Sequence, residues 1–182
     1  MNTTEVSGWR EISQVVALLV QVRPSPLERT LLVGLKKTGV IAGCVVPIGG
    51  HVKPTDNGNL MAATAREVRE ESGLTIVEPA THGHKVAELI VRIRAQRLTL
   101  RIHVFRFYEA DSRGVPPKVD PKEFEWLKFI PLSELPWDQF PPRDRDWLEP
   151  VLTDNVERFV TITCGRDRFD VLDIKQSELF PV

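Results

Sequence analysis

The sequence has little excess charge of either sign. Its 182 residues include 24 Lys and Arg against 25 Asp and Glu, which gives a formal net charge of −1. A chain this close to neutral lacks the broad basic surface that binds duplex DNA, long RNA or an anionic membrane, although a local basic site can still bind a small polyanion. We therefore expect a small-molecule partner, with no nucleic-acid polymer and no membrane partner.

Cysteine is scarce, and the two that are present, Cys44 and Cys164, lie far apart in the sequence. Neither belongs to a Cys-x-x-Cys motif or has histidines at the spacing of a zinc site, so zinc is not predicted. A single disulfide between them is one alternative, but two buried free thiols are the favoured interpretation.

Long hydrophobic runs are also missing. No segment approaches the roughly 20 apolar residues of a membrane span, and the N-terminus lacks a basic region followed by an apolar stretch. Internal repeats and low-complexity tracts are not evident either. With 42% hydrophobic residues, the chain is long enough for one well-packed domain, residues 1–182, which we expect in the cytoplasm. The oligomeric state is left open.

The most informative segment, residues 66–74, reads Arg-Glu-Val-Arg-Glu-Glu-Ser-Gly-Leu. In a helix, Glu67, Glu70 and Glu71 stand at positions i, i+3 and i+4 and share one face. Each like-charge pair costs roughly 0.2–0.5 kcal/mol on an exposed helix. A hard divalent cation would turn this cluster into a binding site. The alternative is an ordinary charged surface helix.

The local sequence predicts a helix over residues 60–72. Asn59 is a suitable N-cap, the segment contains strong helix formers and no proline, and Gly73 stands where a left-handed C-terminal residue is favoured. Small and apolar residues along one flank predict packing against a sheet. Arg66 precedes Glu70 by four residues and is expected to tether it.

Apolar and alternating stretches predict a β-sheet around this helix. The predicted strands are residues 15–22, 31–35, 85–93, 98–110, 126–130, 157–164 and 168–174. The first two are expected to pair, and the third and fourth, like the last two, form hairpins. A second helix is expected from residue 142 or 143 to residue 152. This mixture predicts an α+β sandwich.

One predicted strand changes its pattern near its end. Beyond Val104, Phe105 and Phe107 alternate with Arg106, so the apolar positions move to the opposite face. This end of the strand is predicted to be either bulged or buried on both sides.

The run from Gly50 to Leu74 resembles the Nudix box, G-x5-E-x7-R-E-U-x-E-E-x-G-U, in which U is aliphatic. Residues 66–74 match its second half at every specified position. In the first half, two extra residues precede Arg66, and Asp56 stands where a glutamate is usual. The insertion falls in turn-like residues, which predicts a longer loop before an intact helix.

The resemblance implies the Nudix fold, in which a mixed curved β-sheet is sandwiched between α-helices. Within that family the chain is most similar to the MutT-type oxidised purine nucleoside triphosphatases (8-oxo-dGTP diphosphatases), through residues 35–43, 103–105 and 135–150. The implied activity is hydrolysis of a nucleoside triphosphate to monophosphate and pyrophosphate, with an oxidised purine as one candidate base. The alternatives are hydrolysis of ADP-ribose, a nucleotide sugar or a dinucleotide, and a non-catalytic Nudix-fold binding module.

The resemblance also assigns the phosphate chemistry to particular residues. Glu67 and Glu71 are the expected central ligands of Mg²⁺, or of Mn²⁺, with Glu70 as a further ligand or base. The backbone at Gly50 is an additional metal or phosphate contact, and Arg66 belongs to the catalytic set. Such an ion neutralises phosphate charge and helps to position water for in-line attack.

A further assisting carboxylate is expected from the loop before a late strand. Glu123 and Glu125 compete for that role, and Glu123 is the favoured candidate. The alternative is that both are surface charges.

For the base end of the substrate, the resemblance indicates Lys36, Phe140, Asp144 and Trp147. An aromatic ring can stack on a purine, and a carboxylate can bind its edge. Core packing is an equal alternative for Phe140 and Trp147. The oxidised-purine enzymes usually present an asparagine, a tryptophan and two adjacent acids. The corresponding residues in this chain are Val46, Pro141, Arg143 and Asp144. Only one of the acids is therefore kept.

Overall fold

The computed structural model describes residues 3–6, 8–21, 29–108, 116–153 and 156–181. The strands are β1 (Thr3–Val6), β2 (Trp9–Gln21), β3 (Thr30–Lys36), β4 (Val45–His51), β5 (His84–Ile93), β6 (Leu98–Tyr108), β7 (Phe124–Pro131), β8 (Val156–Cys164) and β9 (Val171–Pro181). The helices are α1 (Leu60–Ser72), α2 (Pro79–His82) and α3 (Asp144–Thr153). Short 3-10 turns are η2 (Pro54–Asp56), η3 (Arg94–Gln96), η5 (Leu132–Glu134) and η6 (Trp137–Gln139).

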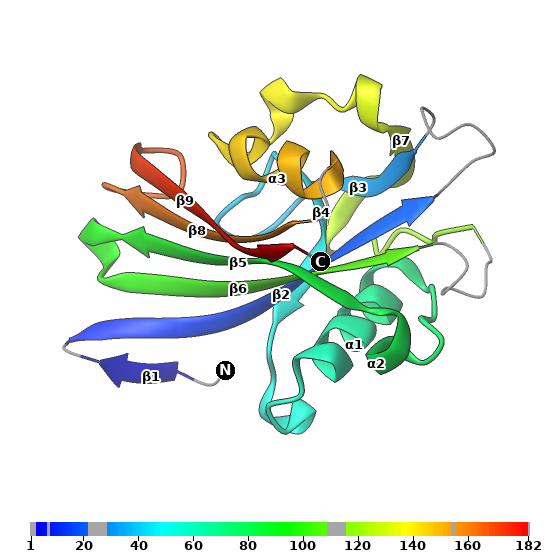
Figure 1. Ribbon diagram of the computed structural model, residues 1–182, viewed down its shortest axis with the longest axis horizontal. Coiled ribbons are helices and arrows are strands. Elements are labelled where there is room, and N and C mark those ends of the chain that lie inside the picture. Colours follow the sequence, from blue (N-terminus) through cyan, green and yellow to red (C-terminus); the bar gives the residue numbers. More distant parts are fainter. Residues whose placement is uncertain (1–2, 7, 22–28, 109–115, 154–155, 182) are drawn as a thin grey trace.

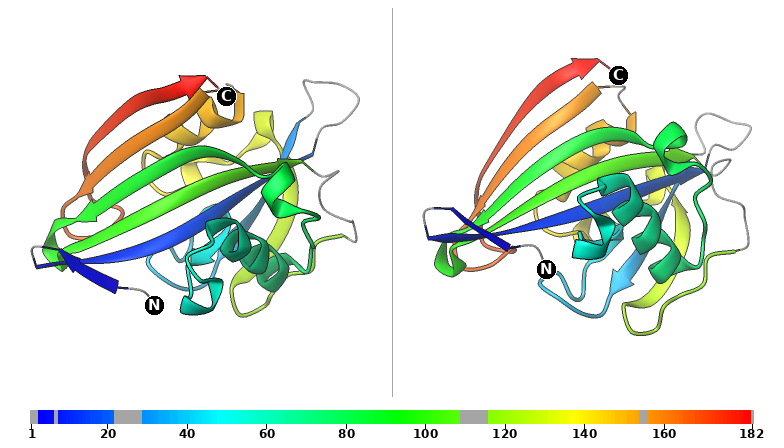
Figure 2. Two further views of the ribbon diagram at one scale, coloured as in Figure 1. Left: turned by 60° about the horizontal axis from the view of Figure 1, so that its bottom comes forward. Right: turned by 90° about the horizontal axis from the view of Figure 1, so that it is seen from below.

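The strands form one mixed, nine-stranded sheet in the order β7-β3-β4-β2-β6-β5-β8-β9, with β1 paired to β2 outside this path. The sheet is strongly curved, and α1 and α3 lie on its opposite sides (Figures 1 and 2). The predicted architecture, a mixed curved sheet sandwiched between helices, is confirmed.

Helix α1 begins and ends at the predicted residues. The Asn59 side chain accepts a hydrogen bond from the Ala62 N–H at 3.0 Å. At the other end Gly73 adopts a φ of 69°, and its N–H donates to the Arg69 carbonyl oxygen. Both ends are therefore set by capping interactions within a few residues of the sequence.

The strand predictions are confirmed in part. The hairpins β5–β6 and β8–β9 form as expected, and β8 also pairs in parallel with β5, which extends the sheet. The predicted pairing of residues 15–22 with 31–35 is mostly wrong, because β3 meets β2 only at Val20–Leu31 and Gln21–Thr30, and β4 lies between them. Several predicted bounds are also wrong: β2 begins at Trp9, and β9 covers Val171–Pro181. The predicted strand ends at residues 22, 109 and 110 lie outside the described residues.

Strand β6 is buried on both sides at its end, as one of the two alternatives predicted. Val104 belongs to the apolar cluster on the α3 side, whereas Phe105 and Phe107 belong to the cluster that contains α1 residues. The irregularity lies in the partner strand, where the β5–β6 register shifts between Lys85 and Ala87. The sheet therefore separates two hydrophobic layers.

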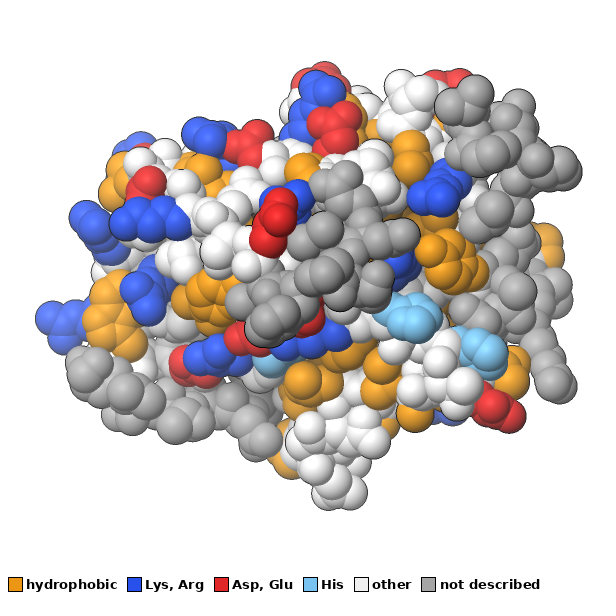
Figure 3. All heavy atoms as spheres, in the orientation of Figure 1, with side chains coloured by type: hydrophobic (Ala, Val, Ile, Leu, Met, Phe, Trp, Pro, Cys, Tyr) orange, Lys and Arg blue, Asp and Glu red, His pale blue; other side chains and the backbone are white. Residues whose placement is uncertain are grey.

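Cys44 and Cys164 are both buried and free, as predicted. Basic and acidic side chains lie interspersed on the face shown in Figure 3, in keeping with the small net charge. Over the described ranges, no helix is long and apolar enough to cross a membrane. The single-domain organisation and the cytoplasmic location stay predictions.

Candidate functional site

Two glycines at the end of β4 bring the backbone against α1. The Gly49 N–H donates a hydrogen bond to Glu71 Oε2 at 3.1 Å. A Cβ atom added at Gly50 would lie 2.5 Å from the Cδ of Glu67, so only glycine lets this carboxylate lie so close to the strand. Glu67 and Glu71 are 7% and 4% exposed. The helix thus holds two carboxylates in a largely water-excluded position.

Lys36, the last residue of β3, joins this helix to the start of β7. Its Nζ lies 2.7 Å from Glu71 Oε1 and 3.0 Å from Glu123 Oε2. The Thr38 hydroxyl also donates to Glu123, at 3.1 Å. Of the two competing acids, the structure brings Glu123 to this cluster, whereas Glu125 is exposed on β7.

The buried and exposed acids of this cluster differ in their electrostatics. Burial raises the pKa of Glu71 to about 7, and the Lys36 ammonium and the Gly49 N–H only partly oppose this effect. The hydrogen bond from Lys36 lowers the pKa of the more exposed Glu123. A further cation near Glu71 would therefore favour its ionised form.

Arg66 holds the other acids of the helix. Its guanidinium donates to Asp56 through Nε at 3.0 Å and through Nη2 at 2.8 Å. The Nη1 atom donates to Glu67 at 2.6 Å and to Glu70 at 3.0 Å. The predicted tether between Arg66 and Glu70 is confirmed. Nη2 also donates to the His51 carbonyl oxygen at 2.9 Å, which fixes the guanidinium to the end of β4.

The two extra residues before Arg66 leave α1 intact, as predicted, and the segment before the helix is organised around Asp56. Asp56 ends the short turn η2 and is 8% exposed, and one of its oxygens accepts from the Lys53 N–H at 2.7 Å. The hydrogen bond from Arg66 is the main reason that the pKa of Asp56 is lowered. Asp56 therefore binds Arg66 from the position at which the box usually has a glutamate.

The donor chemistry at this site fits a hard divalent cation. Glu67, Glu70 and Glu71 offer carboxylate oxygens, and Glu67 packs against the backbone of Gly50. Among the residues that the structure describes, no three acidic, histidine or cysteine side chains are grouped closely enough to hold an ion. To bind one, the acids would have to exchange part of their contacts with Arg66 and Lys36.

The four predicted base contacts are not grouped together, because Lys36 lies with the acids at Glu71 and Glu123, and the other three lie in or beside α3. Phe140 and Trp147 are 5% and 4% exposed and belong to the apolar core on the α3 side. The Trp147 Nε1–H donates to Asp144 at 3.1 Å, and Asp144 also pairs with Arg168. Sequence reasoning missed Arg168, which comes from the turn between β8 and β9 and carries no local motif.

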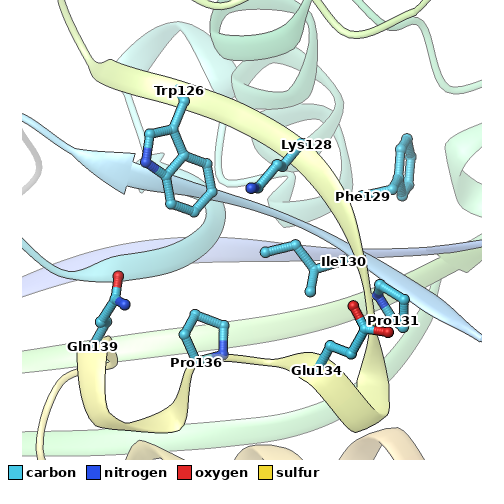
Figure 4. A pocket seen from close by; sticks show the side chains of 8 residues that line it. All are labelled: Trp126, Lys128, Phe129, Ile130, Pro131, Glu134, Pro136 and Gln139. Atoms are coloured by element: carbon cyan, nitrogen blue, oxygen red, sulfur yellow. The ribbon is translucent and has the colours of Figure 1, made fainter.

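A cavity of about 350 Å³ lies beside β7, outside the positions indicated by the sequence. Trp126 and Lys128 extend into it from the strand, and Glu134, Pro136 and Gln139 line it from the segment that follows (Figure 4).

Comparison with known proteins identifies relatives of this fold. The sequence pattern of the NUDIX domain matches residues 14–151. The mMutator MutT protein from Bacillus halodurans has a similar structure, with a TM-score of 0.72 and 15% identity over 91% of this chain and 97% of that one. No curated protein sequence matches the chain.

Two further solved structures are also similar. One is a MutT NUDIX hydrolase from Burkholderia pseudomallei, with a TM-score of 0.58 and 22% identity over 76% of this chain and 96% of that one. The other is the NUDIX domain of NrtR from Shewanella oneidensis complexed with ADP ribose, with a TM-score of 0.60 and 13% identity over 78% and 84%. At these identities the structural likeness shows the fold.

Proposed function

Because the chain belongs to the NUDIX domain family of nucleotide pyrophosphohydrolases, we propose that it hydrolyses a nucleoside triphosphate to monophosphate and pyrophosphate. The observation that supports this most directly is the pair of buried carboxylates, Glu67 and Glu71, set against the glycines of β4. An oxidised purine is one candidate base. The cleaved bond lies in the phosphate chain of the substrate. Residues outside the acidic cluster must therefore determine which base is accepted.

Members of this family generally need a divalent cation, and we propose Mg²⁺, with Mn²⁺ as a substitute. Glu67, Glu70 and Glu71 would hold the ion together with the backbone at Gly50, since hard cations prefer oxygen ligands. When bound, the ion supplies Lewis-acid neutralisation of charge on the phosphate oxygens.

The remaining chemistry comes from side chains around these acids. Glu70 is 44% exposed on its side chain. Burial raises the pKa of Glu70, but hydrogen bonds and charge from Lys53 and Arg66 outweigh it and leave that pKa below its usual value. Glu70 is therefore ionised near neutral pH, and in this proposal it accepts a proton from an attacking water, although its lowered pKa makes it a weaker base than an ordinary glutamate. In this proposal Arg66 orients Glu67 and Glu70.

Lys36 and Glu123 complete the phosphate end of the proposed site. The Lys36 ammonium pairs with both Glu71 and Glu123 and can transfer one of these contacts to a substrate phosphate oxygen. Glu123 would then be released as a second acceptor for a proton. The predicted base contacts of Lys36, Phe140, Asp144 and Trp147 stay predictions. The pairing of Lys36 with the acids favours a phosphate role for it, and the burial of the two aromatic rings favours a packing role for them.

A substrate panel tests this proposal. Purified protein with Mg²⁺ is expected to release pyrophosphate and a monophosphate from at least one nucleoside triphosphate, and 8-oxo-dGTP belongs in the panel beside the common nucleotides. The panel should also include ADP-ribose and a diadenosine compound, because the NrtR domain was solved with ADP ribose. Cleavage of either of these compounds without cleavage of any triphosphate would overturn the proposal. No cleavage of any compound would favour a binding module.

A further inference from the structure

The cavity beside β7 is open to solvent and has the size of a small-molecule site. Its volume of about 350 Å³ lies within the range of roughly 300–1,000 Å³ that is typical of ligand pockets. Trp126 and Lys128 extend from the strand across the cavity toward Pro136 and Gln139 of the following segment (Figure 4). Because strand residues two apart share a face, the regular strand itself presents both side chains to the cavity.

The side chains around this cavity suit an aromatic heterocycle better than a phosphate. Trp126 is half-buried and offers an indole ring, and the Lys128 Nζ lies 4.8 Å from the centroid of that ring. Gln139 is exposed and offers both a donor and an acceptor. Lys128 is the one cation of the lining and Glu134 the one anion, so their charges offset each other. Without excess positive charge, the cavity is not an anion site.

The distance from the acidic cluster matches the length of a nucleotide. Glu123, which pairs with Lys36, stands directly before β7, and Trp126 follows three residues later. At about 3.3 Å per residue, these positions lie roughly 10 Å apart along the strand. Trp126 packs on the α3 side of the sheet, whereas the acids belong to α1 on the other side. Because β7 is the edge strand, a nucleotide would pass round this edge, with its phosphates at α1 and its base beside Trp126.

The residues that the family resemblance indicates for the base are engaged elsewhere. Asp144 is paired with Arg168 and accepts from Trp147, and Trp147 is buried. Phe140 is also buried, and its ring centroid lies 4.9 Å from that of Trp137. Since Gln139 directly precedes Phe140, the buried ring anchors the segment that carries Gln139 into the cavity.

We infer that Trp126 and Gln139 determine which nucleotide is bound, with the indole stacked on the base and the amide hydrogen-bonded to its edge. Stacking on an aromatic ring accepts any base, but the larger π face of a purine gains more contact than a pyrimidine. The inference rests on the proposed function, because it requires phosphates to lie at the carboxylates of α1.

The test measures binding and turnover separately. The probes are ATP and GTP analogues with a methylene group between the α and β phosphorus atoms, titrated by calorimetry in the presence of Mg²⁺. Trp126→Ala is expected to raise Kd roughly 5- to 150-fold, which corresponds to the loss of one stacked base. Trp126→Phe should restore most of the affinity. In steady-state assays KM should rise while kcat stays close to that of the unmodified protein.

Gln139→Ala is expected to reduce the difference in affinity between the two analogues. Asp138→Ala is the matched control, because Asp138 is the exposed neighbour and does not line the cavity. If Trp126→Ala does not fold, Gln139→Ala decides the question. The inference is overturned if Trp126→Ala and Gln139→Ala bind like Asp138→Ala, or if the unmodified protein binds neither analogue.

Failure of this inference can be told apart from failure of the proposed function. If the unmodified protein hydrolyses triphosphates, and Trp126→Ala and Gln139→Ala behave like the control, only the role of the cavity is refuted. Loss of binding in these variants, with no hydrolysis by the unmodified protein, would refute the proposed function and support the cavity as the base site.

Discussion

Replacing Asp56 by asparagine should destabilise the protein, because it breaks the ion pair that fixes Arg66. The side chains of Arg66 and Asp56 are 13% and 6% exposed, and they are joined by hydrogen bonds of 2.8 and 3.0 Å. A third hydrogen bond, from the Lys53 N–H, also ends on Asp56. Asparagine has a similar shape but offers one acceptor oxygen and no charge.

The size of the effect follows from these contacts. A hydrogen bond to a charged group contributes about 1.5–3 kcal/mol, and the substitution removes at least one and weakens another. The loss should stay below the roughly 3–5 kcal/mol of a charge left without any partner, because Arg66 keeps Glu67 and Glu70. We therefore expect Asp56→Asn to lower the free energy of unfolding by about 2–4 kcal/mol, or Tm by roughly 4–16 °C.

Urea denaturation followed by circular dichroism measures this loss. Glu149→Gln is the matched control, because Glu149 makes two hydrogen bonds with Arg145 in an exposed pair on α3. Exposed ion pairs of this kind contribute little to the free energy of unfolding, so the control should unfold like the unmodified protein. Equal stability of the Asp56→Asn and Glu149→Gln variants would refute the role assigned to the Asp56–Arg66 pair.

Two further predictions concern packing and pH. Gly50→Ala places a Cβ 2.5 Å from the Cδ of Glu67. The carboxylate should be misplaced, and kcat/KM should fall roughly 10- to 100-fold. An unchanged kcat/KM would show that Glu67 needs no close contact with Gly50. Burial raises the pKa of Glu88, but hydrogen bonds from Lys85 and Arg101 outweigh it and leave that pKa lowered. The stabilisation that ionised Glu88 gives the folded protein is then present above the ordinary glutamate pKa, about 4.3. It is lost as the pH falls through the pKa of Glu88 in the folded state. Urea denaturation from pH 7 to pH 3 measures the difference in unfolding free energy between the unmodified protein and Glu88→Gln. This difference should decrease as the pH falls, and a difference that stays constant would contradict the prediction.

The sequence alone determines the features whose causes are local. The bounds of α1 follow from Asn59 and Gly73, which act on groups within four residues. The hairpin β5–β6 follows similarly from two β-rich segments joined by a short turn. The predicted start of β2 was too late because residues 9–14 mix polar and apolar side chains. These residues are extended because they pair with β1 and β6.

Contacts between distant segments could not be predicted in this way. Lys36 meets Glu71 across 35 positions, and Glu123 rather than Glu125 meets Lys36 because β3 pairs with β7 at Lys36–Phe124. Arg168 reaches Asp144 only because β8 pairs with β5 and places the following turn near α3. None of these contacts has a local motif, since each depends on the order of strands in the sheet.

We propose above that the buried carboxylates of α1 support cation-dependent hydrolysis of a nucleoside triphosphate. The most direct measurement is the rate of pyrophosphate release against Mg²⁺ concentration, for the unmodified protein, for Glu71→Gln and for the exposed control Glu149→Gln. We predict Mg²⁺-dependent release that falls at least tenfold in Glu71→Gln, about 1.4 kcal/mol of barrier stabilisation, and is unchanged in the control. Turnover by Glu71→Gln at the rate of the unmodified protein would contradict this role of the buried carboxylates.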